Sequence, residues 1–392
     1  MTAREEAAGP TGLASALVAS GALQTDWLGA FHAVPRELFV PERIWPGIPD
    51  GTEQGRAVDY GTDPEAWYRA VYSDIPLTTQ WDDGEHDGDG VGTTPSSSNS
   101  KPEMVFSMLG DLNARDGHRT LEIGSGTGWN AALLCHRTGS ENVVTIEFDP
   151  SVAKSASRNL EDAGFFPTTV VGDGRLGFPG RAPYDRIIAT CSIGDVPYAW
   201  VEQTVTGGVI VAPWGPGNGG EGIARLVVTE PGRASGHFTR PSAFMRLRQQ
   251  RPDRATHDVY LRGEEWPADG IQSRTALSPE DIDGWAPQFA INLRAPGMFW
   301  SVERDDENED EDAYVLWLYG DDRQSWASID YESGAGDYLV VQSGPRRLWD
   351  EREAAYRWWV GQGSPDFTRF GLTVGRDGQT AWLDDPSNPV RA

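Results

Sequence analysis

The segment Leu121-Glu-Ile-Gly-Ser-Gly-Thr-Gly128 decides the fold class of this 392-residue chain. An apolar run enters it in the manner of a buried strand, three glycines follow, and residues 129–137 have helical character. Glycine lets a backbone turn tightly and approach a ligand closely. The amides of such a turn, together with the positive end of the next helix, suit a ligand with polar or anionic groups. Alone, this pattern fits either a dinucleotide site or a plain strand-to-helix connection.

Three later segments help to decide between a nucleotide-type site and a plain connection. Val143-Val-Thr-Ile146 is typical of a second buried strand and ends in Glu147, where an acidic residue about 20 positions past the glycines can hold ribose hydroxyls. Thr169-Val-Val171 runs into Gly172-Asp173-Gly174, whose aspartate can accept a hydrogen bond from an adenine amino group. Residues 184–190 form a fourth strand. Together these features resemble the S-adenosyl-L-methionine (SAM) methyltransferase fold more than a dehydrogenase, although each residue alone also fits a cap or a turn.

The predicted cofactor site collects residues from these strand ends: Glu122, Gly124, Ser125, Gly126, Gly128, Glu147, Phe148, Asp173 and Gly174. The alternation of helices and strands predicts an α/β, Rossmann-like fold with a mostly parallel sheet covered on both faces. Further strands are expected at residues 209–213, 226–228 and 244–247.

The character of the chain changes near residue 251. Nine of the sixteen tryptophans lie between Trp266 and Trp382. Strands are predicted at residues 289–293, 314–318, 326–329, 338–342 and 379–383, a helix at 347–360 and an acidic loop at 304–312. We therefore predict two domains, residues 1–250 and an α+β extension over 251–392. The aromatic residues of the extension form a packed core or a groove that grips a peptide.

The bulk composition limits the partners and the compartment. A net charge of −26 opposes nucleic acid and favours a cationic cofactor or a basic peptide, unless it serves solubility alone. Two cysteines give no disulfide framework. No run approaches a membrane span and no signal peptide pattern is present, so a cytoplasmic protein is expected. The acidic segment 82–90 contains His86, but its spacing fits no calcium loop, so no metal site is predicted.

Six segments occur in the order typical of one family: Val34–Pro41, Tyr72–Pro76, Ser98–Met104, Leu121–Gly128, Gly172–Gly174 and Pro183–Ile188. Over residues 20–248 the chain resembles protein-L-isoaspartate (D-aspartate) O-methyltransferases. The resemblance implies SAM as the cofactor and a serine that orients the acceptor carboxylate. Ser100 matches the family serine, and Ser98 and Ser97 are further candidates; a capping or loop role is the alternative for each.

The chain departs from this family in three places. The usual loop reads Thr-Ile-Ser-x-Pro, whereas residues 93–102 are serine-rich, an acidic insertion precedes them, and about 140 residues follow the usual end. This combination resembles an actinobacterial subgroup encoded beside ribosomally made peptides (RiPPs), notably ATP-grasp-crosslinked graspetides. The resemblance implies methylation of an ordinary aspartate in a modified peptide that the extension holds, with the ester then closing to an aspartimide (a succinimide).

Three other functions stay open. The first is repair of L-isoaspartyl residues in damaged proteins by carboxyl methylation, with the same fold and cofactor. The second is peptide binding without turnover, which the intact cofactor motif opposes. The third is nucleic-acid methylation, which is disfavoured because the fourth strand ends in Ala189-Thr-Cys-Ser-Ile193 rather than in the Asn/Asp-Pro-Pro-Tyr type of motif used for base amines. The sequence leaves the oligomeric state and the peptide partner open.

Overall fold

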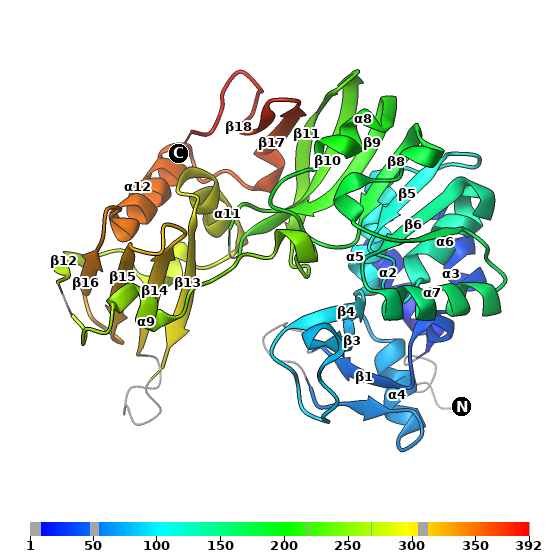
Figure 1. Cartoon of the computed structure of the whole chain (residues 1–392), viewed down its shortest axis with the longest axis horizontal. Coiled ribbons are helices and arrows are strands. Elements are labelled where there is room, and N and C mark those ends of the chain that lie inside the picture. The colour runs from blue at the N-terminus through cyan, green and yellow to red at the C-terminus, as the bar shows by residue number, and fades with distance from the viewer. Residues whose placement is uncertain (1–8, 48–54, 218, 268, 305–312, 392) are drawn as a thin grey trace.

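The computed structural model describes residues 9–47, 55–217, 219–267, 269–304 and 313–391. Three sheets of nine, five and four strands are arranged along an arc, with the nine-stranded sheet between the other two (Figure 1). The helices are α2 (Pro10–Ala19), α3 (Leu28–Ala33), α4 (Pro64–Val71), α5 (Pro102–Leu112), α6 (Trp129–Thr138), α7 (Pro150–Asp162), α8 (Tyr198–Glu202), α9 (His257–Leu261), α10 (Pro279–Ile282), α11 (Trp285–Arg294) and α12 (Leu348–Gly361). The predicted acidic loop at 304–312 lies, except for Arg304, outside the described residues.

The nine-stranded sheet has the order β18-β17-β11-β10-β9-β8-β5-β6-β7. Its strands are β5 (Thr120–Ile123), β6 (Val143–Glu147), β7 (Thr168–Val171), β8 (Tyr184–Ala189), β9 (Thr204–Trp214), β10 (Glu221–Glu230), β11 (Arg233–Ser242), β17 (Phe370–Gly375) and β18 (Gly378–Leu383). The pairs from β7 to β9 are parallel, and those from β9 to β18 are antiparallel. The predicted α/β fold with a parallel core is confirmed.

Helices cover both faces of the parallel half, which explains its continuous apolar strands. Successive residues of β8 point to opposite faces. Ile188 belongs to the cluster that contains residues of α2, α3, α5 and α6, whereas Ile187 belongs to the cluster that contains residues of α8 and α11. Residues Val209 and Ile210 of β9 divide in the same way. This two-sided burial fixes the register of the strands, and hence the position of the loops at their carboxyl ends.

The four-stranded sheet has the order β2-β1-β3-β4 and is antiparallel. Its strands are β1 (Arg43–Pro46), β2 (Val58–Asp59), β3 (Leu77–Trp81) and β4 (Pro95–Asn99). β4 lies within the serine-rich segment that the sequence presents as a loop, and it pairs Ser98 with Thr78 of β3. Ser96, Ser97 and Ser98 therefore have the backbone of a strand, whereas Ser100 lies between the end of β4 and the start of α5.

The five-stranded sheet has the antiparallel order β12-β16-β15-β14-β13. Its strands are β12 (Ile271–Thr275), β13 (Met298–Glu303), β14 (Tyr314–Gly320), β15 (Trp326–Tyr331) and β16 (Tyr338–Ser343). Two predicted strands are wrong. Residues 289–293 belong to helix α11, and residues 244–247 form only one bridge, between Arg246 and Ser192.

The C-terminal part of the chain contributes to both large sheets. β17 pairs with β11, and Phe367 and Phe370 share a hydrophobic cluster with Trp214 and Phe238. Helix α11 belongs to two clusters, because Phe289 packs toward the nine-stranded sheet and Ile291 toward the five-stranded sheet. Residues on both sides of the predicted boundary at residue 250 thus share one hydrophobic cluster, and the division into two domains stays a prediction. Within the described ranges, no helix has the length and apolar character needed to cross a membrane.

Candidate active site

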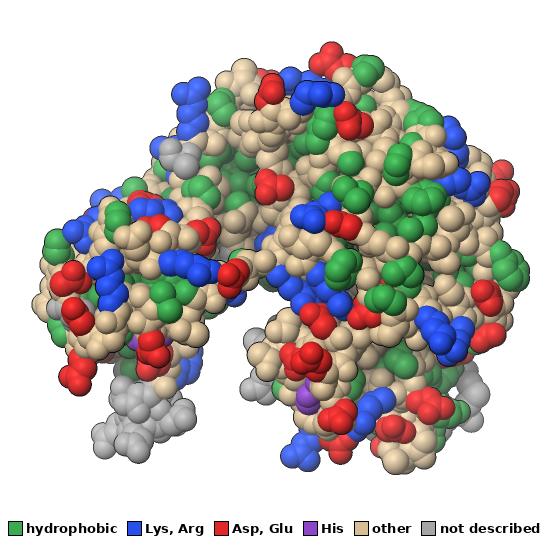
Figure 2. Space-filling model, in the orientation of Figure 1, with side chains coloured by type: hydrophobic (Ala, Val, Ile, Leu, Met, Phe, Trp, Pro, Cys, Tyr) green, Lys and Arg blue, Asp and Glu red, His purple; other side chains and the backbone are tan. Residues whose placement is uncertain are grey.

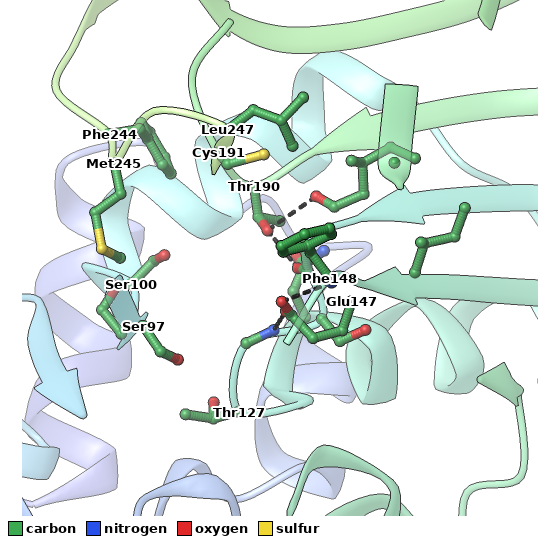
Figure 3. A pocket seen from close by; sticks show the side chains of 18 of the residues that line it. Ser97, Ser100, Thr127, Glu147, Phe148, Thr190, Cys191, Phe244, Met245 and Leu247 are labelled. Carbon is green, nitrogen blue, oxygen red and sulfur yellow. Dashed lines mark hydrogen bonds between the residues drawn. The ribbon is translucent and has the colours of Figure 1, made fainter. Parts of the chain in front are cut away.

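The pocket of interest lies at the carboxyl ends of β5, β6 and β8, where ligands bind in open α/β sheets. Its volume is about 1020 Å³, open mouth included. Figure 3 shows Ser97 and Ser100 on one side and Glu147, Phe148 and Thr190 on the other. The pocket thus brings the predicted cofactor segment and the predicted acceptor serines face to face, although they come from different sheets.

The glycine turn gives the cofactor wall its shape. Gly124 and Gly126 have φ of +90° and +51°, which side chains rarely adopt. A Cβ at Gly124 would lie 2.8 Å from Thr190 Oγ1, and one at Gly126 would lie 3.2 Å from the carbonyl oxygen of Ser98. The absence of side chains at Gly124 and Gly126 therefore leaves a cradle, that is, a space along the turn that a ligand can enter and that any larger residue would fill. Gly128 instead packs against α7 and does not line the pocket.

Glu122 supports the turn from below. Its carboxylate is fully buried and accepts hydrogen bonds from Asn130 Nδ2 at 2.7 Å and Thr145 Oγ1 at 2.5 Å. The Thr145 hydroxyl also bonds the Ser125 hydroxyl at 2.5 Å. Burial raises the pKa of Glu122 to about 7. Ser125 lines the pocket, whereas Glu122 lies beneath it and holds the turn in place.

Glu147 and Phe148 form the wall beside the turn. The Glu147 carboxylate accepts hydrogen bonds from three backbone amides, those of Gly126, Phe148 and Asp149. Carboxylate oxygens have about four lone-pair sites, so acceptor capacity remains for a hydroxyl of a ribose. The Phe148 ring is 45% exposed and lies under the Arg248 guanidinium at 5.9 Å. This wall fits a nucleoside with free hydroxyls.

Asp173 lies differently from the sequence-based expectation. Its two carboxylate oxygens accept hydrogen bonds from the Arg175 guanidinium, which lowers the pKa of Asp173. Gly174 lines the pocket but Asp173 does not. The adenine contact of Asp173 therefore stays a prediction, and it would require Arg175 to share the carboxylate.

The three predicted acceptor serines all line the pocket, but their hydroxyls differ. The Ser97 side chain is buried, and its oxygen accepts a hydrogen bond from Thr79 Oγ1 at 3.2 Å. The hydroxyls of Ser98 and Ser100 make no hydrogen bond with any residue that the structure describes. These two hydroxyls are therefore available to a ligand.

A buried arginine holds the serine segment against the glycine turn. Arg36, 2% exposed, donates six hydrogen bonds: to carbonyl oxygens within residues 71–75, to both oxygens of Asn99 and to the carbonyl oxygen of Ser100. Desolvation lowers the pKa of Arg36 to about 9. Asn99 in turn donates to Thr127 Oγ1 at 2.9 Å. The segment 97–100 is thus tied both to the N-terminal region and to the cofactor wall.

The residues that line the pocket include no histidine, lysine or aspartate in the described part of the chain. Burial raises the pKa of the Cys191 thiol to about 12, so this thiol stays protonated. Glu147 is the only carboxylate among these lining residues, and it accepts hydrogen bonds from three backbone amides, which leaves room for about one further donor. The described residues also hold no cluster of three acidic, histidine or cysteine side chains that fits a metal ion.

Sequence reasoning missed two contributors to the site. Arg36 stands in the segment Val34–Pro41, where an arginine inside an apolar stretch between two prolines is the available signal. The segment 244–251 lines the pocket with Phe244, Met245 and three arginines. The signal there is a basic run, because four arginines fall within residues 246–254 of a chain with net charge −26.

Comparison with known proteins gives a consistent result. The sequence profile of the family described as protein-L-isoaspartate(D-aspartate) O-methyltransferase (PCMT) matches residues 60–250. The protein-L-isoaspartate O-methyltransferase of Ignicoccus hospitalis is 33% identical over 205 residues, which cover 52% of this chain and 80% of the relative. That of Methanosarcina mazei is 38% identical over 154 residues, which cover 39% of this chain but only 58% of the relative.

A solved protein-L-isoaspartate O-methyltransferase structure matches 96% of this chain and 100% of its own, with a TM-score of 0.53 and 21% identity. At this identity the match concerns the fold alone. It nevertheless extends over the region after residue 250, so the C-terminal sheet and helices are part of the shared architecture.

The fold and the glycine-lined pocket define a SAM-dependent methyltransferase. The residues fit this cofactor, because the cradle at Gly124 and Gly126 admits a ligand and Glu147 retains acceptor capacity for ribose hydroxyls. With its relatives, the chain belongs to the protein-L-isoaspartate O-methyltransferase family. It is therefore a carboxyl O-methyltransferase, and the expectations of an enzyme and of SAM as its cofactor are confirmed.

Proposed function

We propose that the enzyme methylates the free carboxylate of L-isoaspartyl residues in proteins and peptides. The observation that carries this proposal is the set of charged side chains in the described part of the pocket: it includes no histidine, lysine or aspartate, and its one carboxylate, Glu147, already accepts hydrogen bonds from three backbone amides. An alcohol or amine acceptor needs a base, whereas a carboxylate is already ionised near neutral pH. The pocket chemistry therefore suits an acceptor that arrives deprotonated.

We assign roles to the residues on the basis of their positions in the pocket. The glycine turn, Glu147 and Phe148 hold SAM, which supplies an electrophilic methyl group. Ser100 and Ser98 orient the acceptor carboxylate by donating their free hydroxyls, and Arg36 fixes the backbone that carries them. Positioning carries most of the rate, since well-aligned reactants gain roughly 7–11 kcal/mol.

The product ester reacts further without a protein group. Methylation makes the carbonyl carbon of the substrate electrophilic, and the backbone nitrogen that follows it attacks with loss of methanol. A five-membered imide results, and its hydrolysis returns part of the isoaspartyl residues to aspartyl residues. Repeated rounds give net repair.

The test uses the full chain, SAM and two peptides of one sequence, with either an isoaspartyl or an aspartyl residue at one position. Mass spectrometry should find a methyl ester and then an imide from the isoaspartyl peptide, with no change in its aspartyl twin. Absence of ester from the isoaspartyl peptide would refute the proposal.

A second candidate is methylation of an ordinary aspartate in a ribosomally made, crosslinked peptide, which ends in an aspartimide. The observation in its favour is the serine-rich β4, which departs from the usual family loop next to the acceptor position. The shared fold beyond residue 250 weakens the argument from the extension. Methylation of the crosslinked peptide encoded nearest this gene, with no reaction of the isoaspartyl peptide, would favour this candidate.

A further inference from the structure

A second pocket adjoins the active-site pocket and shares Phe244 and Arg246 with it. Its volume is about 780 Å³, open mouth included. It is lined by Glu221 of β10 and by Gly215, which follows β9, and on the other side by Met298 and Phe299 of β13 and by Asp321, which follows β14. A ligand that fills both pockets therefore passes from the methyl-transfer site toward the C-terminal sheet.

Four arginines follow this path, in a chain whose net charge is −26. They are Arg246, Arg248, Arg251 and Arg254, all of which line one or both pockets. Figure 2 shows Lys and Arg side chains gathered at the inner wall of the hollow between the two lobes. These arginines are thus clustered in one place on a chain that is acidic as a whole.

Three of these arginines already have carboxylate partners. Arg246 pairs with Glu221 at 2.9 Å and also donates to the carbonyl oxygens of Gly215 and Gly217. Arg248 pairs with Asp149 at 3.0 Å and with Asp83 at 3.1 Å. Arg251 pairs with Asp83 at 2.9 Å. These contacts fix the three arginine side chains in place and neutralise most of their charge.

Arg254 is different. Its guanidinium lies over the Phe299 ring, 5.1 Å from the centroid. Among the described residues it makes no ion pair and no hydrogen bond. Asp321 also lines this pocket but is not within ion-pair distance of Arg254. Arg254 is exposed, and its contact with the ring leaves the guanidinium donors free, which is an arrangement suited to a carboxylate.

We propose that the second pocket is a substrate subsite in which Arg254 pairs with the carboxylate of an acidic residue near the methyl acceptor in the peptide. This inference rests on the proposed function, because it places the acceptor residue in the first pocket. It assigns the enzyme a preference for acidic peptides, and it gives the C-terminal sheet a part in substrate selection through Phe299.

The test compares two isoaspartyl peptides, one with glutamates on both sides of the isoaspartyl residue and one with glutamines in their place. For the unmodified enzyme we expect kcat/KM to be about tenfold higher with the glutamate peptide, the size of one charge-assisted hydrogen bond. In Arg254→Gln, kcat/KM should fall for the glutamate peptide only, so that the two peptides react about equally well. Arg254→Lys, which keeps the positive charge, should retain part of the preference for the glutamate peptide. Arg158→Gln, on the exposed side of α7, is the matched control and should keep the full preference.

A second readout separates this inference from the proposed function. The affinity of both peptides is measured in the presence of S-adenosyl-L-homocysteine, where no turnover occurs. A tenfold binding preference that Arg254→Gln removes would support the subsite even if neither peptide were methylated, an outcome that would refute isoaspartyl methylation alone. Equal affinity for the two peptides, or a preference that survives in Arg254→Gln, would overturn the subsite.

Discussion

The difference among the serines of the pocket gives the first prediction at the residue scale. Ser100→Ala removes a free hydroxyl that points to the acceptor side, so kcat/KM should fall by about 10- to 100-fold. Ser97→Ala, whose hydroxyl is engaged with Thr79, is the matched control and should change kcat/KM by less than about threefold. Steady-state kinetics with the isoaspartyl peptide measure both. An equal effect of the two substitutions would refute the assignment of Ser100.

Glu122 couples the stability of the cofactor wall to pH. Its pKa rises from 4.5 in the unfolded chain to about 7 in the folded protein, so the folded protein holds a proton over this interval. The stability that the protonated form supplies is fully present below pH 4.5 and is lost as the pH rises through 7. The total loss amounts to about 3 kcal/mol.

Glu122→Gln keeps the shape of this side chain without its charge. Between about pH 5 and about pH 8, the free energy of unfolding should fall in the unmodified protein by about 1–3 kcal/mol more than in the variant. Urea unfolding at the two pH values measures the difference. The same loss of stability in both proteins would show that Glu122 is not the titrating group.

At the scale of elements, the segment 95–100 depends on Arg36 for its position. Arg36→Lys keeps the positive charge but loses the planar fork that reaches Val71, Ile75 and Ser100 together. We expect kcat to fall by about 100-fold, because a displacement of about 1 Å is enough for such a loss. The affinity for S-adenosyl-L-homocysteine, measured by calorimetry, should change little. A loss of cofactor affinity as large as the loss of kcat would contradict this role.

Several elements could be predicted from the sequence because one physical signal dominates each of them. β5 and β6 are mostly apolar runs, the first followed by Gly124 and the second ending in Glu147, and β8 has the apolar run Ile187-Ile-Ala189; residues of all three strands are buried in the clusters on the two faces of the sheet. The cofactor wall could be predicted for the same reason. α11 was mistaken for a strand because Phe289-Ala-Ile-Asn-Leu293 is apolar throughout, and a short buried helix that faces two cores has the same pattern.

Other parts of the site depend on tertiary contacts that no local pattern reveals. β4 reads Pro-Ser-Ser-Ser-Asn and has none of the β-branched or aromatic residues that are enriched in strands, and it forms because β3 offers a partner. The clamp by Arg36 joins residues more than 60 positions apart. The segment 244–247 looked like a strand, but it crosses the pocket and makes a single bridge instead.

At the scale of the whole molecule, the two large sheets depend on one another. Cutting the chain after residue 250 removes β17, β18 and α11, which cover Trp214 and Phe238. The exposed aromatic surface should make the shortened protein aggregate or lose its cooperative unfolding transition. Calorimetry and size-exclusion chromatography measure this. A soluble fragment with a cooperative transition would show that residues 1–250 form an independent domain.

The central claim is that this pocket, whose one carboxylate among the described residues already accepts hydrogen bonds from three backbone amides, methylates an isoaspartyl carboxylate. The most direct measurement is mass spectrometry of the isoaspartyl peptide and its aspartyl twin after incubation with the full chain and SAM. The account predicts that the isoaspartyl peptide alone gains one methyl group and then loses methanol to form the imide. A methyl group that resists mild base, and so sits on nitrogen or on an alcohol oxygen, or no methylation of the isoaspartyl peptide at all, would contradict it.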